Sequence, residues 1–161
     1  MSLPDFLPQI LTLSGTFEEI LDSLYSVFNN DFKIKKTKHF NYIVIYDSRV
    51  LPDGHGKEEG FWHVITEKNP QTGDREIDFR RAERLPWASP MMENSTRPEL
   101  RVYDYDHISK AKGIRRYIWI YEHDYVLVLK KIKNKYFWIT AYYIDSRGRK
   151  RKVENQYNNR L

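Results

Sequence analysis

The chain has 161 residues, of which 40% are hydrophobic and 30% are charged, and it contains no cysteine. This length suits one domain with a single core, and no apolar run approaches the roughly 20 residues that cross a bilayer. The lack of cysteine excludes disulfides, thiolate nucleophiles and cysteine-based zinc sites. The N-terminus lacks the basic start and the cleavage site of a signal peptide. We therefore expect a cytoplasmic protein that does not enter a membrane.

Positive charge is concentrated in the C-terminal part of the chain. The formal net charge is +5. Residues 1–32 hold five acids and no Lys or Arg, whereas residues 130–152 are rich in Lys and Arg and hold one acid, Asp145. A local basic region creates a field that steers polyanions, which favours a partner such as nucleic acid.

The first predicted element is a helix that begins after Thr16. Thr16 and Glu19 have the spacing of a capping box, in which each side chain bonds an otherwise free backbone N–H. Apolar residues then recur at helical spacing until the polar stretch "FNND". The next segment, "NYIVIYD", is predicted as a strand. "LPDGHGKEEG" is predicted as a loop because of its Pro, its glycines and its charges.

The middle of the chain has a weaker pattern. Residues 61–66, "FWHVIT", are predicted as a short strand that ends in the polar turn "EKNPQTGD". Residues 78–94 are mixed: their first half suits a turn or two of helix, and Pro86 limits how far that helix extends. "STRPEL" is predicted as a loop.

The last third gives the clearest prediction. "IRRYIWIY", "YVLVLKKI" and "YFWITAYYID" are strand-like runs separated only by "EHD" and "KNK". Connections this short force antiparallel neighbours, so residues 114–145 should form a three-stranded meander. The basic tail that follows suits a short helix or a partly disordered segment.

Alternation along these strands predicts two different faces. One face is aliphatic and fits a core under the helix. The other carries Arg115 and Trp119 on the first strand and Trp138, Thr140 and Tyr142 on the last, with Lys131 near its margin. Aromatic rings with nearby cations suit single-stranded nucleic acid, because bases stack on rings and cations meet phosphates. A sheet packed on both faces needs large residues too, so core packing is an equal alternative.

Candidate chemistry centres on one histidine and a group of arginines. No pair of histidines has the helical spacing of a metal site. His63, inside an apolar run, is either a core histidine or a group that moves protons. Arg80, Arg81 and Arg84 follow within a few residues and can clamp a phosphate. Their alternative reading is a solvated helix face with Glu83 as counter-ion.

Three motifs in this order, "GFWHVIT", "RRAERLPW" and "YFWITAYY", resemble the phage-encoded branch of the barnase–EndoU–colicin–RelE nuclease superfamily. The resemblance covers about residues 60–145. It implies a single α+β domain with an antiparallel sheet, an N-terminal helix packed on one face and a barnase/RelE-like nuclease core. Residues 1–59 would add a helix and a strand, and residues 146–161 a basic tail.

The resemblance also implies a toxin-type ribonuclease that needs neither metal nor cofactor. Such an enzyme removes the 2′-hydroxyl proton of RNA, stabilises the phosphorane and protonates the leaving oxygen. His63 would act as general acid or base, Thr140 and Tyr142 would orient the scissile group, and tRNA or rRNA would be the target, with an immunity protein as a second partner. The phosphate and the RNA would be held by Arg80, Arg81, Arg84, Arg115, Trp119, Lys131 and Trp138.

Two other functions fit the same sequence. One is a non-catalytic module that binds RNA or DNA on the aromatic face. The other is a phage-associated interaction protein that uses this face as an interface. A nuclease requires His63, the arginines and Thr140 to lie within about one phosphate of each other in the fold.

Overall fold

The structure, a computed structural model, describes residues 2–161 and belongs to the α+β class, as the sequence predicts. In chain order the elements are α1 (Phe17–Phe28), the π-helix η1 (Asn29–Ile34), β1 (Lys38–His39), β2 (Tyr42–Ile45), α2 (Glu59–Ile65), β3 (Thr66–Lys68), β4 (Arg75–Ile77), α3 (Phe79–Ala82), α4 (Leu85–Glu93), β5 (Leu100–Asp106), β6 (Ile114–Ile120), β7 (Tyr125–Ile132), β8 (Lys135–Tyr143) and α5 (Arg147–Asn158). Among these described residues, no helix is both long and apolar enough to cross a membrane.

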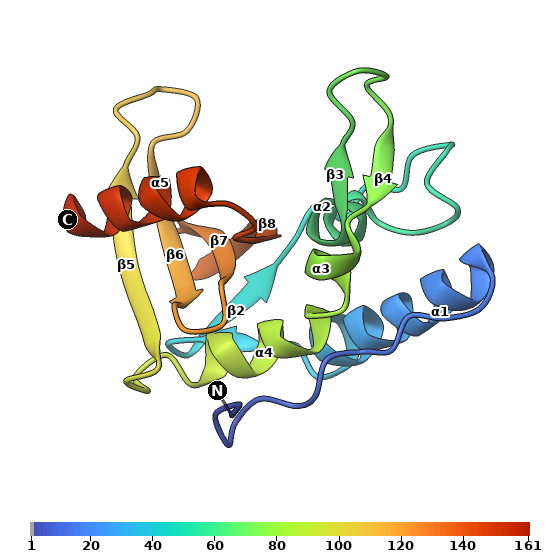
Figure 1. Cartoon of the computed structure of the whole chain (residues 1–161), viewed down its shortest axis with the longest axis horizontal. Helices are drawn as coiled ribbons and strands as arrows, with labels where there is room; N and C mark the ends of the chain where they lie inside the picture. Colours follow the sequence, from blue (N-terminus) through green and yellow to red (C-terminus); the bar gives the residue numbers. More distant parts are fainter. Residues whose placement is uncertain (1) are drawn as a thin grey trace.

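The described residues form a main sheet in the order β1-β2-β8-β7-β6-β5, and β3 and β4 form a separate hairpin (Figure 1). The predicted meander is confirmed, because β7 pairs antiparallel with both β6 and β8. At one end the sheet gains β5, which sequence analysis did not find. Near the other end β2 runs parallel to β8, with Val44 opposite Tyr136. The sheet is therefore mixed, and the expectation of a purely antiparallel sheet is wrong: parallel neighbours need a crossover, which the long segment between β2 and β8 supplies.

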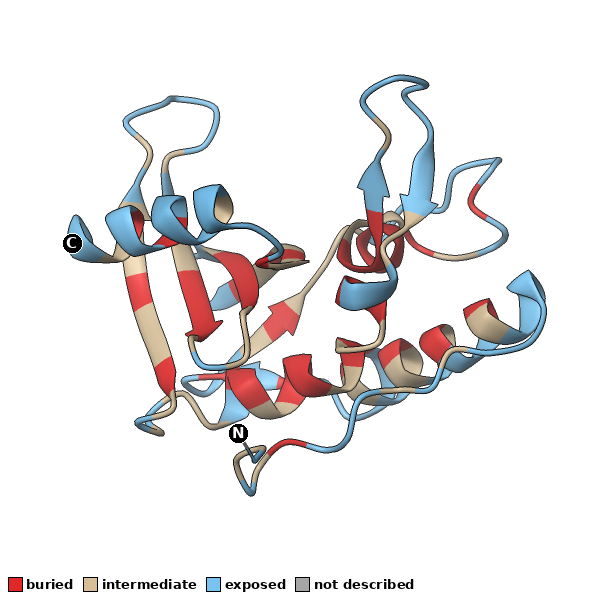
Figure 2. Ribbon diagram, in the orientation of Figure 1, coloured by how far each residue is buried: buried red, intermediate tan, exposed pale blue. Residues whose placement is uncertain are grey.

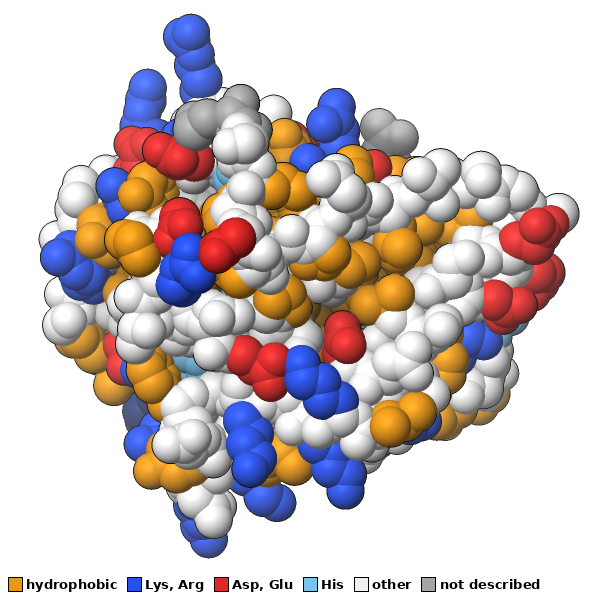
Figure 3. Space-filling model, turned by 90° about the horizontal axis from the view of Figure 1, so that it is seen from below, with side chains coloured by type: hydrophobic (Ala, Val, Ile, Leu, Met, Phe, Trp, Pro, Cys, Tyr) orange, Lys and Arg blue, Asp and Glu red, His pale blue; other side chains and the backbone are white. Residues whose placement is uncertain are grey.

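A first core lies between one face of the sheet and the helices α1, α2 and α4. The predicted capping box is present, since Thr16 Oγ1 accepts from the Glu19 N–H at 3.2 Å and the Glu19 carboxylate accepts from the Thr16 N–H at 3.4 Å. Leu24 and Phe28 of α1 are fully buried in the same cluster as Leu127 of β7. Figure 2 shows buried residues concentrated between α4 and the strands. Figure 3 views the molecule from below, where hydrophobic, basic and acidic side chains are interspersed.

The run "FWHVIT" is a helix, α2, and the predicted strand at residues 61–66 is wrong. Five of the seven residues of α2 are buried, and only Glu59 and His63 are partly exposed, so its sequence lacks the broad polar face that identifies a surface helix. A short, mostly apolar run cannot be assigned to helix or strand from its periodicity. Gly60 allows close packing here, because a Cβ at this position would lie 2.8 Å from the Cβ of Tyr46.

A second core lies on the opposite face, under the basic tail. This tail forms α5, whose first turn is capped by the Ser146 hydroxyl, which accepts from the Arg149 N–H at 3.1 Å. Val153 and Tyr157 of α5 pack in the cluster that contains the aromatic residues of β5 and β6. Figure 1 shows α5 lying across these strands. The sheet is thus packed on both faces, and a helix covers its aromatic side.

A β-bulge in β8 changes which residues share a face. Trp138 lies opposite Leu129, but Thr140 lies opposite Val128, so Ile139 is an additional residue between the two pairs. An additional residue shifts the alternation of side chains by one position. Trp138 therefore joins the first core, while Tyr142 faces α5. The expectation that Trp138, Thr140 and Tyr142 share one face is wrong for this reason.

Candidate functional site

Three predicted site residues meet at the end of α2. The Thr140 hydroxyl donates to the carbonyl oxygen of His63 at 2.9 Å. Arg81 Nη1 donates to the same carbonyl at 3.3 Å and to the carbonyl of Thr66 at 2.6 Å. The last carbonyls of a helix have no partners within it, so strand β8 and helix α3 together satisfy this helix end. His63, Arg81 and Thr140 are therefore close in space, but the group that joins them is the backbone of His63.

The imidazole of His63 makes a different contact. Its Nδ1 atom lies 3.0 Å from Nη1 of Arg75 in β4, and because a guanidinium only donates, Nδ1 is the acceptor. Burial, with the Arg75 charge adding to it, lowers the pKa of His63 below its ordinary value. The ring is therefore neutral at pH 7 and is engaged by an arginine of the β3–β4 hairpin.

A basic pocket of about 240 Å³ lies between α5 and the strands β6 to β8. No Asp or Glu of the described chain lines it. The pocket brings together four residues that the sequence proposed for catalysis or RNA binding, namely Arg81, Arg115, Thr140 and Tyr142. Its complete lining is Arg81, His107, Lys112, Arg115, Tyr117, Val128, Thr140, Tyr142, Arg149, Lys152, Val153 and Gln156.

Several buried polar atoms around this pocket have no hydrogen-bond partner within residues 2–161. They are Nε of Arg115 and Oε1 of Gln156; Nε of Arg81 also makes no hydrogen bond, but it lies 3.6 Å from Oδ2 of Asp78. Arg81 is only 7% exposed, and burial lowers the pKa of its guanidinium. Buried polar groups are nearly always paired in folded proteins, so donors and acceptors left free beside a cavity mark a place where a ligand can complete them.

A histidine–tyrosine pair stands at the wall of the basic pocket. Nε2 of His107 lies 2.6 Å from the hydroxyl of Tyr117. Burial, then the charges of Lys112 and Arg115, lower the pKa of His107. Burial raises the pKa of Tyr117 to about 12 and also raises the pKa of Tyr142. At neutral pH the imidazole is therefore an unprotonated base, and both phenols keep their protons.

The other two predicted arginines have structural partners. Arg84 Nη1 donates to Glu83 at 2.7 Å and to the carbonyl of Arg80 at 2.8 Å. The Arg84 guanidinium carbon lies 4.3 Å from the ring centroid of Tyr143, and that of Arg80 lies 5.5 Å from the same ring. Neither residue lines the basic pocket. Both guanidiniums hold α3 against β8.

The predicted stacking residues and one predicted cation also lie away from the basic pocket. Trp138 and Trp119 are each 1% exposed, so no base can reach either ring in this fold. Trp138 packs on Phe32 with centroids 4.7 Å apart. Lys131 lies over the ring of Tyr42, 4.9 Å from its centroid, at a different part of the sheet.

Sequence reasoning missed His107 because it did not identify β5. Tyr103 and Tyr105 of β5 both pack in the second core, so alternation continued beyond the strand places His107 on the same face. The run "LRVYDYDH" carried that signal. Arg149 and Lys152 were missed for another reason: their role depends on the helix folding back over the sheet, which no local pattern predicts.

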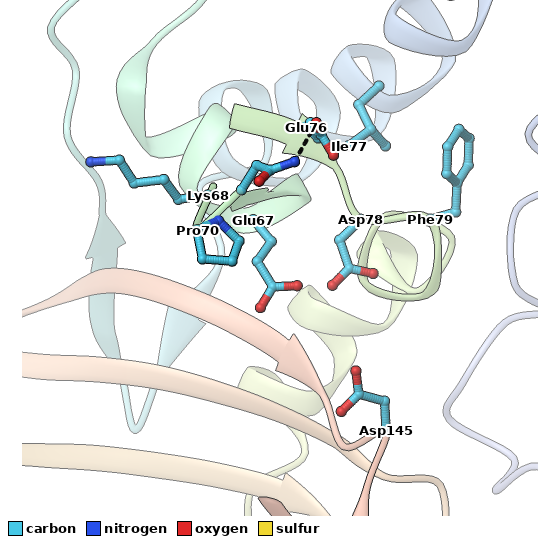
Figure 4. Close-up of a pocket in the computed structure, with 9 residues that line it drawn as sticks. Glu67, Lys68, Pro70, Glu76, Ile77, Asp78, Phe79 and Asp145 are labelled. Atoms are coloured by element: carbon cyan, nitrogen blue, oxygen red, sulfur yellow. Dashed lines mark hydrogen bonds between the residues drawn. The ribbon is translucent and has the colours of Figure 1, made fainter. Parts of the chain in front are cut away.

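An acidic cleft of about 660 Å³ adjoins the basic pocket. In Figure 4 the carboxylates of Glu67, Asp78 and Asp145 point into this cleft. Arg149 links the two regions, since its guanidinium lies 3.3 Å from Glu67 and 3.9 Å from Asp145. Arg81 does the same through Asp78 at 3.6 Å. Within residues 2–161 no group of three or more His, Cys, Asp or Glu side chains has the arrangement of a metal site.

Comparison with protein-family models, curated proteins and solved structures gives no match for this chain. The nuclease resemblance therefore stays an expectation that rests on the motifs alone. An α+β fold hosts many unrelated functions, so any functional argument has to come from the pocket and its side chains.

Proposed function

We propose that this protein is a ribonuclease that binds a phosphate of RNA in the basic pocket and cleaves the adjacent bond through the 2′-hydroxyl. The observation that carries the proposal is the composition of the pocket. Five cationic side chains converge there beside a neutral imidazole, with no carboxylate of the described chain in the lining; the cations are Arg81, Lys112, Arg115, Arg149 and Lys152.

The size of the pocket suits a phosphate group. Its volume of about 240 Å³ lies below the roughly 300–1,000 Å³ of sites for drug-sized ligands. Guanidiniums bind phosphate oxygens in a fixed fork, and the unpartnered Nε of Arg115 is a donor available for such a bond. Arg81 and Arg149 already pair with carboxylates of the acidic cleft, so a phosphodiester would mainly neutralise Lys112, Arg115 and Lys152.

The His107–Tyr117 pair supplies the base. When the Tyr117 hydroxyl donates to Nε2 of His107, its oxygen can take the proton of the RNA 2′-hydroxyl while it passes its own proton to the imidazole. The freed 2′-oxygen attacks phosphorus, and the bond from phosphorus to the 5′-oxygen breaks. The products are a 2′,3′-cyclic phosphate and a 5′-hydroxyl.

Tyr142 supplies the proton that the leaving oxygen needs. Its raised pKa keeps the phenol protonated, and Arg149, whose guanidinium carbon lies 5.7 Å from the ring centroid, stabilises the phenolate that forms. Water then returns a proton to Tyr142 and removes one from His107. Arg81 is positioned before the reaction by its bonds to the two carbonyls at the end of α2, and such preorganised donors stabilise the charge of the phosphorane.

In this proposal the geometry favours His107 over His63 as the acid–base residue. The His107 ring lines the basic pocket, whereas the His63 ring is bonded to Arg75. His63 contributes through its carbonyl, which positions Arg81 and Thr140.

The test is single-turnover cleavage of an end-labelled mixed-sequence RNA in EDTA by wild type, His107→Gln and His63→Gln. Wild type should give fragments that end in a cyclic phosphate. His107→Gln should lower the rate by a factor on the order of 10²–10⁴, because proton transfer is lost, and His63→Gln should change it by less than about tenfold, since its carbonyl remains.

An RNA that carries 2′-deoxyribose at the cleaved position is the control, and it should be bound but not cut. If wild type binds RNA and cuts none, the protein is a binding module rather than an enzyme. Loss of cleavage in His63→Gln with full activity in His107→Gln would move the acid–base role back to His63.

A further inference from the structure

A second concave region, the α5–β5 groove, adjoins the basic pocket. It encloses about 410 Å³ between α5 and Tyr105 of β5. Gly148, Arg151, Asn155 and Asn159 line it at spacings of three or four residues, which places them on one face of the helix. None of the described Asp or Glu residues lines the groove. A helix face built from amides and cations is suited to a polar, negatively charged chain.

The groove and the basic pocket share a wall. Lys152 and Gln156 line both of them. On the strand side, the ring of Tyr105 in the groove meets the ring of His107 in the pocket edge-on, with centroids 4.9 Å apart and planes at 85°. A nucleotide whose phosphate occupies the pocket therefore has its neighbouring base within reach of the groove.

Gln156 gives the groove a specific chemical character. This residue is 8% exposed, and its Oε1 atom is buried with no hydrogen-bond partner within the described chain. A carboxamide oxygen only accepts hydrogen bonds, so this atom requires a donor. Asn155 adds an exposed amide beside it on the same side of the helix.

We infer that the α5–β5 groove is a nucleobase subsite that selects adenine or cytosine next to the phosphate in the basic pocket. The inference rests on the proposed function for the location of that phosphate. Adenine and cytosine carry an exocyclic amino donor where guanine and uracil carry a carbonyl acceptor. The amino group completes Gln156 Oε1, whereas a carbonyl places one acceptor against another.

The remaining groups of the groove serve the same ligand. The phenol ring of Tyr105 is the aromatic surface in the groove on which a base can stack, as in proteins that bind single-stranded RNA. Arg151 and Lys152 meet the backbone phosphates on either side. The subsite thus separates two tasks: cations hold any RNA, and the amides distinguish its bases.

The experiment uses fluorescently labelled heptamers that carry 2′-deoxyribose, so that none is cleaved: oligo-A, oligo-C, oligo-G, oligo-U and oligo-inosine. Wild type should bind oligo-A and oligo-C roughly tenfold tighter than oligo-U. Inosine differs from adenosine by a carbonyl in place of the amino group, so it should bind as weakly as uracil. Gln156→Leu should remove the preference, so that oligo-A and oligo-C bind no more tightly than oligo-U.

A matched pair of exposed variants guards against a fold defect in Gln156→Leu. Asn155→Ala changes a residue of the groove and should reduce the preference for oligo-A over oligo-U. Asn158→Ala changes a residue at the end of the same helix, outside the groove, and should leave this preference as it is. Equal binding of all five oligonucleotides by wild type would overturn the subsite and leave the proposed function standing. If none of them binds, the proposed function fails with it.

Discussion

The two faces of the sheet carry different kinds of side chain. On the first, the sheet meets α1, α2 and α4 through apolar side chains such as Leu127 and Ile118, both fully buried. On the second, it meets α5 through tyrosines, a tryptophan and arginines, and the buried hydroxyl of Tyr103 and Nε1 of Trp119 have no partners within residues 2–161. Polar groups of this kind are costly in a core.

The difference separates the residues that make the fold from those that make the site. The first face is filled mainly by the chain's own apolar side chains, although the buried hydroxyl of Tyr125 there also has no partner within residues 2–161. The second is covered by a helix with few apolar residues: Val153 and Gln156 are its buried positions. Because α5 is held on the sheet mainly by polar and aromatic contacts, a ligand can bind between the helix and the strands, and the basic pocket lies there.

The largest expected effect is on stability and comes from the first face. Leu127→Ala removes a fully buried side chain and should lower the free energy of unfolding by about 2–5 kcal/mol. Val153→Ala on α5 removes two methyl groups and should lower it by about 1–2 kcal/mol. Urea denaturation gives both values, and RNA affinity is measured on the folded fraction. Only Val153→Ala should weaken RNA binding; the reverse result would show that α5 is not part of the site.

A pH effect should also come from the first face. His39 is fully buried; its Nδ1 lies 3.0 Å from the carbonyl oxygen of Met92, and its Nε2 accepts from Arg116 at 3.0 Å. Burial, aided by the Arg116 charge, lowers its pKa to about 4. The unfolded chain binds this proton near pH 6.5, so the stabilisation is complete above that pH and is lost as the pH falls toward 4.

Between pH 6.5 and 5 the loss should amount to about 2 kcal/mol. Chemical denaturation at several pH values measures it, with His39→Gln as the comparison because a glutamine does not titrate. If the free energy of unfolding of wild type fell no more steeply with decreasing pH than that of His39→Gln, the lowered pKa of His39 would be contradicted.

A smaller effect on stability should come from Thr140, which connects strand β8 to the end of α2. Its hydroxyl donates to the His63 carbonyl, so Thr140→Val should lower the free energy of unfolding by about 1 kcal/mol. Arg81 donates to the same carbonyl, so the cleavage rate should fall only if the loss of the Thr140 hydroxyl displaces Arg81. Melting temperature and single-turnover rate, measured together, separate this positioning role from direct contact with RNA, in which the rate would fall without a change in stability.

The sequence predicted those features that depend on local pattern. The capping box of α1 and the meander of β6, β7 and β8 follow from spacing and from short polar turns, and both are confirmed. The assignment of α2 failed because a short, mostly buried helix has too few polar residues to show a helical pattern. The bulge at Ile139 could not be predicted, because a strand with one additional residue has the same strand-like composition. The bulge nevertheless moves the side chains that follow it to the opposite face of the sheet.

The candidate site was predictable only in part. Arg81, Arg115, Thr140 and Tyr142 line one pocket, as a functional interpretation of the last strand requires. The sequence could not show that Arg81 lines the pocket and Arg84 does not, because this difference depends on the tertiary contacts of each guanidinium.

We propose that the pocket under α5, rather than the basic surface as a whole, binds the RNA phosphate. Arg115 and Lys131 were both predicted from the sequence as RNA contacts, and only Arg115 lines the basic pocket. The most direct measurement is the affinity for a 2′-deoxy oligonucleotide as a function of salt, for wild type, Arg115→Gln and Lys131→Gln. We expect Arg115→Gln to weaken binding and to reduce the salt slope by about one unit, and Lys131→Gln to leave the slope unchanged. Equal slopes for wild type and Arg115→Gln would contradict this proposal.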